Sequence, residues 1–558
     1  MMRKALFFVF FLNTIISFSQ KEVERPNIIW IVCEDISPTL SFYGDATAKT
    51  PNLDALAKES IIFDNAFATT PVCAPSRSAI ITGMLPSSIG TMHMRTGRDI
   101  QSWSKGVYKD TVYDDTKKIV LDLKGKPIRE YSAVIPEEIK CFSEIMRANG
   151  YYCTNNQKTD YQFAPPQSAW DENDGKATWK NAPKGVPFFS VFNFEVTHES
   201  RIWKNKDLPL TANPQTVPLP PYYPDNSIVR TDVARHYSNI EILDKEVGAL
   251  IAKLKSDNLF DNTIIFFYSD HGGPLPHQKR EIYDSGLKVP LIIRFPKGEK
   301  AGRNKQMVSF TDLAPTVLSL ANIEPPKYMD GQAFLGKFKA PNRKVVFGTS
   351  DRFDEFADRI RAVRDSQYLY VKNYHTTLPK YKDVFYRKSI PMMNIILELH
   401  QQHLLNQAQE YWFQPKVIEE LYDCKKDPYQ LHNLASNPKF QKKLKELRIC
   451  LEKQFESKVD FGVFSEAELI LKMWPNFVQP KTDKVEYKLI DNKISLSSST
   501  VGASISYQIV SKNTTEDVSN VSAWKLYTKP FALAPDSKII AKASRIGFKE
   551  SEISNFDN

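Results

Sequence analysis

The sequence of 558 residues contains few histidines and cysteines, nine and six respectively, and no apolar run beyond its amino terminus that is long enough to cross a membrane. It has no internal repeat, no zinc-finger or helix-turn-helix spacing and no aromatic ribonucleoprotein motif, so we expect no nucleic-acid partner and no membrane span. Hydrophobic residues make up 42% and charged residues 25%, which excludes a disordered chain, collagen and a disulfide-rich miniprotein. The formal net charge of +9 suits an anionic ligand, including a polyanion other than nucleic acid.

The first residues are typical of a signal peptide. Arg3 and Lys4 precede an apolar run over residues 5–18, and small or polar residues follow it. We predict a signal peptide at residues 1–19 and an exported mature protein that is periplasmic or secreted. No cysteine directly follows the run, so a lipid anchor is not expected. In an exported chain six cysteines could form up to three disulfides, and the sequence cannot choose among the 15 pairings. The role considered below for Cys73 removes it from this pool and leaves at least one thiol unpaired.

Short apolar runs alternate with helical patterns in the first part of the chain. The runs are typical of strands covered on both faces and lie at residues 27–32, 187–194, 263–268 and 289–295. Amphipathic helix patterns lie at residues 53–60, 135–149, 233–256 and 312–321. This alternation predicts an α/β fold with a mostly parallel sheet flanked by helices. The polar residues that end such strands gather at one edge of the sheet, where ligands bind.

The pattern changes twice towards the carboxyl terminus. Short strands at 344–348 and 368–371 and helices at 391–408 and 439–455 indicate a smaller α+β unit. Alternating stretches at 504–510 and 538–543, in a region rich in Ser, Thr, Val and Lys, indicate a small β-sandwich. We predict a catalytic α/β domain at residues 24–340, a smaller domain at 341–480 and an accessory sandwich at 483–555.

The most specific motif begins at Cys73. The sequence Cys73, Ala74, Pro75, Ser76, Arg77 is followed by Thr82 and Gly83. It resembles the signature of the type I sulfatase family, whose cysteine is oxidised after synthesis to formylglycine (3-oxoalanine). The resemblance implies an alkaline-phosphatase-like fold and a hydrated aldehyde at position 73, one oxygen of which attacks sulfur while the other later expels sulfate. A helix that begins here would favour an anion, which Arg77 would hold. A structural or disulfide cysteine is the alternative.

Acidic residues end two of the predicted strands. Glu34 and Asp35 follow the first strand, and Asp270 and His271 follow the third. Carboxylates are the ligands that Ca²⁺ or Mg²⁺ prefers, and such an ion would polarise sulfate oxygens. The resemblance implies a metal site of Glu34, Asp35, Cys73, Asp270 and His271, with Ca²⁺ expected and Mg²⁺ as the alternative. The family usually has aspartate where Glu34 stands, and His271 could orient the sulfate instead of binding the metal.

Three further residues match family positions that contact the sulfate. Lys158 and Lys279 would bind sulfate oxygens, and His198 would protonate the leaving oxygen or hold the sulfate. Many sulfatases have a histidine two residues after the first of these lysines, where this chain has Asp160. Either lysine taken alone would be interpreted as a solvated surface charge. The predicted catalytic set comprises Cys73, Arg77, Lys158, His198 and Lys279.

The expected substrate is a sulfated polysaccharide or its oligosaccharides. Arginine side chains suit the sulfate and carboxylate groups of a polyanionic glycan. The predicted substrate-binding residues are His93, Arg95, Asp160, Arg352, Asp354 and Arg361. For residues 351–361, an ordinary salt-bridge cluster is the alternative. The chain resembles bacterial polysaccharide sulfatases that act on algal glycans such as ulvan or carrageenan, and this resemblance favours an algal glycan such as ulvan.

Two other functions fit part of the pattern. Phosphatases and phosphonate hydrolases of the alkaline phosphatase superfamily share the sheet and the metal carboxylates, but they use Ser or Thr and several histidines, whereas only His271 lies in the predicted metal set. A non-catalytic glycan-binding protein built on an inactive sulfatase domain would not need Cys73, Pro75 and Arg77. A sulfatase would also require a formylglycine-generating or anaerobic sulfatase-maturing enzyme as a partner.

Overall fold

The computed structural model describes residues 25–97, 101, 106–114, 116–513 and 524–557. The predicted signal peptide at residues 1–19 lies outside these residues. Within the described ranges, no helix is both long and apolar enough to cross a membrane. All six cysteines are described and all are free thiols, so the disulfides that export would allow are not formed here.

A nine-stranded sheet forms the centre of the molecule, in the order β4–β3–β5–β1–β6–β8–β2–β7, with β9 paired to β2. Five neighbouring strands run parallel: β4 (Glu172–Asp174), β3 (Tyr152–Asn156), β5 (Phe188–Phe194), β1 (Asn27–Cys33) and β6 (Thr263–Ser269). The remaining strands are β8 (Leu291–Arg294), β2 (Ser60–Phe67), β7 (Lys288–Val289) and β9 (Gly302–Ser309). The pairs β6–β8, β2–β8 and β2–β7 are antiparallel, whereas β9 is parallel to β2. The mostly parallel sheet confirms the predicted α/β fold class.

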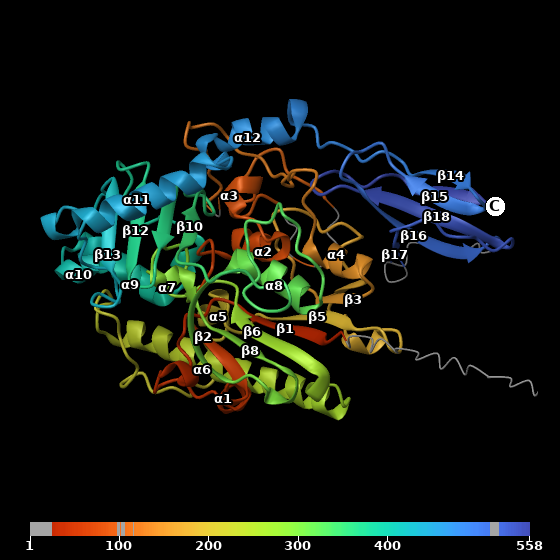
Figure 1. Ribbon diagram of the computed structural model, residues 1–558. Coiled ribbons are helices and arrows are strands. Elements are labelled where there is room, and N and C mark those ends of the chain that lie inside the picture. The colour runs from red at the N-terminus through yellow and green to blue at the C-terminus, as the bar shows by residue number, and fades with distance from the viewer. Residues whose placement is uncertain (1–24, 98–100, 102–105, 115, 514–523, 558) are drawn as a thin grey trace, which may run out of the picture.

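Helices cover both faces of this sheet (Figure 1). In β1, Trp30 and Val32 belong to the core beneath α2 (Cys73–Thr82), α4 (Phe142–Ala148) and α8 (Leu313–Leu320). Ile29 and Ile31 belong to the opposite core, with α1 (Pro51–Lys58) and α6 (Ser227–Ser256). Successive side chains of a strand point to opposite faces, so the continuous apolar run in β1 serves both layers.

A second, antiparallel sheet packs beside the first. It has the order β10 (Val346–Ser350), β11 (Ile360–Arg364), β12 (Tyr368–Asn373), β13 (Glu419–Asp423). One face contacts Leu444 and Leu447 of α11 (Gln441–Glu456), and the other packs against Phe67 and Leu287 from the large sheet and its helices. The remaining helices are α3 (Pro86–Ile89), α5 (Ser200–Lys204), α7 (Asp284–Leu287), α9 (Pro391–Gln401), α10 (Gln407–Glu410) and α12 (Glu466–Met473).

The carboxyl-terminal region forms two small antiparallel sheets. A hairpin of β14 (Glu486–Ile490) and β15 (Lys493–Ser497) lies beside a sheet of β17 (Lys525–Leu526), β16 (Ser504–Ser511), β18 (Ser537–Ser544) and β19 (Ser554–Asp557). Ile494 and Leu496 share a core with Ile505, Ile539 and Ala541, which gives the two-layer packing of a small sandwich. The boundaries at 340/341 and 480/483 stay predictions.

Two helices are shorter than their apolar patterns suggested. Residues 135–141 are not helical, and α4 begins only at Phe142. Its start is set by Glu144, whose carboxylate accepts a hydrogen bond from the Cys141 N–H at 3.1 Å in a capping box. The pattern at 391–408 is divided because α9 ends at Gln401 and His403 then adopts a left-handed φ of 56°.

Candidate active site

The candidate active site lies at the carboxyl edge of the parallel strands. β1 pairs with β6 in the register Cys33↔Ser269 and with β5 in the register Cys33↔Phe194. Glu34 and Asp35 therefore leave the sheet next to Asp270 and His271 on one side and next to residues 195–198 on the other. The Asp35 N–H donates to Asp270 Oδ1 at 3.2 Å, which ties the first two strand ends together.

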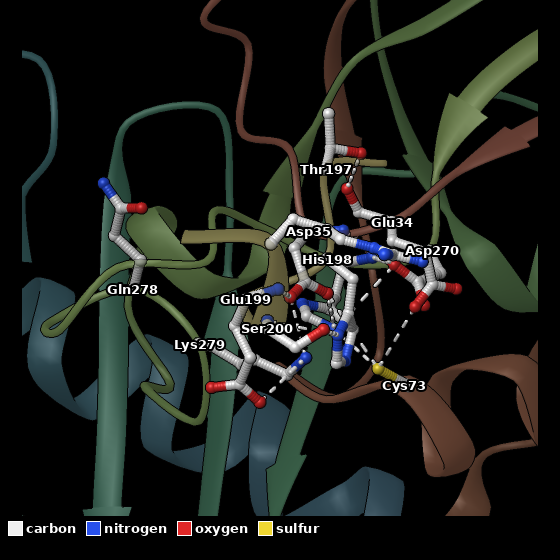
Figure 2. Close-up of polar contacts among 12 residues, drawn as sticks. Glu34, Asp35, Cys73, Thr197, His198, Glu199, Ser200, Asp270, Gln278 and Lys279 are labelled. Atoms are coloured by element: carbon white, nitrogen blue, oxygen red, sulfur yellow. Dashed lines mark hydrogen bonds and ion pairs between the residues drawn. The ribbon is translucent and has the colours of Figure 1, made fainter. Parts of the chain in front are cut away.

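Cys73 is the first residue of α2 and points at these strand ends (Figure 2). Its Sγ lies 3.3 Å from His271 Nε2, 3.9 Å from Asp35 Oδ1 and 4.0 Å from Glu34 Oε2. The side chain is fully buried. Burial raises the pKa of the Cys73 thiol, although Lys279 partly opposes this shift. The sequence motif thus places a protonated thiol among carboxylates.

Arg77 connects three strand ends from one turn further along α2. Residues four apart lie on the same face of a helix, so Arg77 faces the sheet edge together with Cys73. Its Nε lies 3.2 Å from Asp270 Oδ2 and its Nη1 donates to Asn193 Oδ1 at 2.7 Å, while Nη2 pairs with Glu34. Burial lowers the pKa of Arg77, but Glu34 and Asp270 raise it by more than burial lowers it, so the guanidinium stays charged.

Two lysines each pair with one of the acidic residues after β1. Lys158 Nζ lies 2.6 Å from Glu34 Oε2, and Lys279 Nζ lies 2.7 Å from Asp35 Oδ2. Burial raises the pKa of Glu34 and Asp35, but these cations, with Arg77 beside Glu34 and His271 beside Asp35, lower both pKa values below their ordinary range. The site therefore combines ionised carboxylates with buried cations, an arrangement that suits a metal ion and an anionic group together.

The donor set around His271 fits a divalent cation. Its Nδ1 lies 3.0 Å from the Gly272 carbonyl oxygen and so donates a hydrogen bond to it, which directs Nε2 at Asp35 Oδ1, 3.0 Å away. Burial lowers the pKa of His271, but Asp270 and Asp35 raise it well above its ordinary value. This raised pKa favours a second proton, on Nε2. A metal ion can bind the Nε2 lone pair in place of that proton. Ligand atoms of Asp35, Cys73, Asp270 and His271 lie within 4.8 Å of one another.

His198 follows β5 and belongs to a second group of close ligand atoms, with Glu34, Asp35 and Cys73. Burial and Lys279 lower the pKa of His198 to about 3, so the ring is neutral at neutral pH. Its Nδ1 accepts a hydrogen bond from the Ser200 N–H at 3.3 Å. Ser200 Oγ also lies 2.9 Å from Nδ1 and can donate to it, so the ring proton is on Nε2, from which the ring can donate a hydrogen bond to a ligand.

Several charged residues in and around the site have a strained backbone. Left-handed φ values occur at Asp35 (51°), Arg95 (61°), Asp160 (53°), Arg280 (74°) and Asp354 (51°). Non-glycine residues in this region cost about 1–3 kcal/mol each and cluster where function requires them. The Arg95 side chain is 35% exposed and its Nη1 lies 3.3 Å from Asp160 Oδ1, while Arg280 Nε donates to Asp354 Oδ2 at 2.7 Å. Met94 and Phe353, the neighbours of Arg95 and Asp354, pack against Cys73.

Next to Lys158 the described residues line an open cleft of about 490 Å³. Its lining includes Asn193, Glu195, Arg201 and Glu246. The lining is mostly polar, and the cleft has room for a saccharide unit beside Lys158.

The structure does not bring His93, Arg352 and Arg361 into this cluster. Arg352 is buried and pairs with Glu466 of α12, and its N–H donates to His93 Nδ1 at 3.2 Å. Arg361 has no exposed surface, and its guanidinium contacts Asp351 at 2.9 Å and Asp460 at 2.7 Å. Donors engaged in this way hold the segment that carries Asp354 in place, and they are not available to a substrate.

Three residues of the site were not predicted from the sequence. Asn193 accepts from Arg77 and donates to the Lys158 carbonyl oxygen at 3.3 Å. Glu199 and Arg280 form a buried pair beside Lys279. The one available signal was Asn193, a polar residue in an otherwise apolar run, because Glu199 and Arg280 resemble ordinary surface charges in sequence.

A buried cysteine among carboxylates and cations at this edge of an α/β sheet defines a hydrolase of anionic esters. The family model described as sulfatase matches residues 26–323, and the model described as the C-terminal part of N-sulphoglucosamine sulphohydrolase matches residues 275–409. The chain therefore belongs to the sulfatase family, whose members are sulfuric ester hydrolases. The family match does not support the alternative of a phosphatase.

Relatives agree with this assignment over most of the chain. An ulvan-active sulfatase of Formosa agariphila is 42% identical over 567 residues, covering 95% of this chain and 91% of that protein. Human N-sulphoglucosamine sulphohydrolase is 24% identical over 471 residues, covering 77% of this chain and 90% of that protein. A solved 2-O GAG sulfatase has a similar fold, with a TM-score of 0.53 at 20% identity over 78% of this chain and 92% of that chain.

Proposed function

We propose that this protein is an exported sulfatase that hydrolyses sulfate esters of a sulfated polysaccharide or its oligosaccharides, with ulvan as the favoured glycan. The observation that carries the proposal is the burial of Cys73 against Asp35 and His271, with Lys158 and Lys279 paired to the same carboxylate cluster. The glycan is suggested by the 42% identical relative, an ulvan-active sulfatase.

The nucleophile is proposed to be residue 73 after oxidation. Because burial raises the pKa of the Cys73 thiol, the unmodified side chain has little thiolate character and is a poor nucleophile at neutral pH. Formylglycine, produced by a formylglycine-generating or anaerobic sulfatase-maturing enzyme, would supply a hydrated aldehyde whose oxygen attacks sulfur.

The buried cations are proposed to bind the sulfate group. Arg77, Lys158 and Lys279 have pKa values above their ordinary range, because the carboxylates around them outweigh the opposite effect of burial. They stay charged and can neutralise the sulfate oxygens in a site that excludes water. Neutral His198 can donate a hydrogen bond from its Nε2–H to a sulfate oxygen or to the leaving oxygen of the sugar.

The carboxylates are proposed to hold a divalent metal. Glu34, Asp35, Asp270 and His271 surround Cys73 with oxygen ligands and one nitrogen ligand. Oxygen ligands favour Ca²⁺, with Mg²⁺ as the alternative, and such an ion would act as a Lewis acid on the sulfate. Glu34 also accepts from Lys158 and Arg77, so its longer side chain serves the cations as well as the metal.

Arg95, Asp160 and Asp354 are proposed to contact the sugar. They form the rim next to Met94 and Phe353, and Arg95 is partly exposed. Export to the periplasm or the medium is proposed from the amino-terminal segment alone, and it would bring the enzyme to an external polysaccharide.

The test combines mass spectrometry with sulfate release. The wild-type chain is expressed with a formylglycine-generating enzyme, and the tryptic peptide containing Cys73 is expected to lose about 18 mass units, as thiol is replaced by aldehyde. Wild type should release sulfate from ulvan, whereas Cys73→Ala should not. Cys450→Ala is the matched control, because Cys450 is a free, half-buried thiol on α11. An unmodified Cys73 in a protein that still binds ulvan would favour the non-catalytic glycan-binding alternative.

A further inference from the structure

A buried carboxylate, Glu199, lies between two cations beside the site. Its oxygens accept from Arg280 Nη1 and Nη2 at 2.8 and 2.9 Å, and its Oε1 lies 3.2 Å from Lys279 Nζ. Glu199 and Arg280 are each 1% exposed. Figure 2 shows Glu199 next to Lys279, with the side chain of Gln278 lying apart from the cluster. Because the backbone N–H of Glu199 donates to Asp35 Oδ2 at 2.7 Å, this residue is anchored to the metal-ligand candidates.

Lys279 therefore has two anionic neighbours. Lys279 Nζ lies 2.7 Å from Oδ2 of Asp35, the carboxylate that also contacts Cys73, and 3.2 Å from Glu199 Oε1. Which of the two carboxylates attracts Lys279 more strongly depends on how far the charge of Glu199 is compensated by other groups. Arg280 engages both oxygens of Glu199 in a two-point, charge-assisted contact, which is stronger than a single hydrogen bond from a lysine. Glu199 is thereby largely neutralised, and its contact with Lys279 is the longer one.

Arg280 is itself held in this orientation from two sides. Its Nε donates to Asp354 Oδ2 at 2.7 Å, and its backbone N–H donates to the Pro71 carbonyl oxygen at 2.7 Å. Its φ of 74° is in the left-handed region, so the adjacent side chains of Lys279 and Arg280 are fixed by an unusual backbone conformation. Arg280 does not contact Cys73 in any hydrogen bond or ion pair found among the described residues, and it acts through its neighbours.

We propose that Arg280 is a positioning residue that occupies Glu199 and so leaves Lys279 free to bind the sulfate group. This inference rests on the proposed function, since it assigns Lys279 to sulfate. Without Arg280, Glu199 would carry an uncompensated buried charge whose nearest cation is Lys279. Lys279 would then move from Asp35 towards Glu199, and the site would lose a sulfate ligand.

The experiment measures the Kd of inorganic sulfate by titration calorimetry on the full chain, together with KM and kcat for hydrolysis of the sulfate ester. Arg280→Gln is expected to weaken sulfate binding about tenfold or more, the loss of one hydrogen bond to a charged group. The double variant Glu199→Gln/Arg280→Gln is expected to return to within about threefold of wild type, because the competing charge is gone. Across these variants, changes in KM should parallel changes in the Kd of sulfate more closely than changes in kcat do.

The matched control is Arg364→Gln. Arg364 makes the same two-point contact with Asp284, at 3.0 Å for both bonds, but neither residue contacts Lys279. It should lower stability without changing the Kd of sulfate. Wild-type sulfate affinity in Arg280→Gln, or equal weakness in the single and double variants, would overturn the proposal.

Glu199→Gln alone keeps the test valid if Arg280→Gln does not fold. It removes the competing charge and preserves the shape of the side chain, so it should bind sulfate no more weakly than wild type. A tenfold weaker Kd in Glu199→Gln would contradict the role assigned to Arg280. If wild type releases sulfate from esters but the variants do not differ from it in these ways, the inference alone is refuted. A wild type that neither binds sulfate nor releases it refutes the proposed function and the inference together.

Discussion

Replacing Arg77 by lysine tests how the anionic cluster is held together. The guanidinium contacts Asp270, Asn193 and Glu34, which follow or end three different strands. Lysine keeps the positive charge but has a single nitrogen and no planar fork. It can therefore satisfy one or two of these contacts, and the remaining one or two are lost.

The size of the effect follows from the contacts. A hydrogen bond to a charged group contributes about 1.5–3 kcal/mol, so the loss of one or two in Arg77→Lys should cost about 1.5–6 kcal/mol of interaction. If these contacts orient the sulfate in the transition state, kcat/KM should fall about ten- to 20,000-fold, at one decade for each 1.36 kcal/mol. The assay is sulfate release at matched metal concentration, with the folded fraction measured by circular dichroism.

Arg147→Lys is the control for a merely structural effect. Arg147 is also buried and donates to Asp171 at 2.8 Å and to the Gln167 carbonyl oxygen at 3.2 Å, but it lies outside the site. It should lower stability and leave kcat/KM of the folded protein nearly unchanged. Activity of Arg77→Lys within threefold of wild type would refute the reasoning, as would an equal loss in Arg147→Lys.

Three further outcomes are expected. After dialysis against a chelator, Ca²⁺ should raise the melting temperature of wild type but not of Asp270→Asn, and an equal rise in both would argue against the metal site. Burial raises the pKa of Asp460, but Arg361 lowers it to about 2 in the folded protein, from an ordinary value of 3.8. Above about pH 4 the ionised side chain therefore contributes about 2 kcal/mol to the free energy of unfolding, and this contribution is lost as the pH falls towards 2. The difference in free energy of unfolding between wild type and Asp460→Asn, from urea titrations, should therefore shrink over that range, and a constant difference would contradict the pairing. Arg95→Ala should raise KM for ulvan about three- to tenfold, the loss of one partly exposed charged contact, and leave kcat for 4-nitrophenyl sulfate within twofold; an unchanged KM for ulvan would remove Arg95 from the sugar site.

Much of the fold and the centre of the site could be predicted from local patterns. The continuous apolar run of β1 requires cover on both faces, and such strands belong to parallel sheets. In that arrangement neighbouring strands end at the same edge, so Glu34 and Asp270 meet although they are far apart in sequence. The motif from Cys73 to Arg77 contains its own chemistry, because one helical turn places both residues on the same face.

The partners of the other charged residues could not be predicted in this way. An arginine in sequence can face solvent, a substrate or a buried carboxylate, and only packing decides among them. Arg352 and Arg361 were expected to contact substrate, but Glu466 and Asp460, about a hundred residues away, engage both. Glu199 and Arg280 were overlooked for the same reason, since each is an ordinary charge until the fold buries it against the other.

Local sequence thus determined the strands, the helix that presents Cys73 and the types of side chain at each strand end. Those features depend on the period of apolar residues and on neighbours within a few positions of the chain. Tertiary structure alone decided which charges are neutralised and which stay available to bind a ligand. That choice depends on desolvation and on the geometry of groups distant in sequence, as in the pairing of Arg280 with Glu199 next to Lys279.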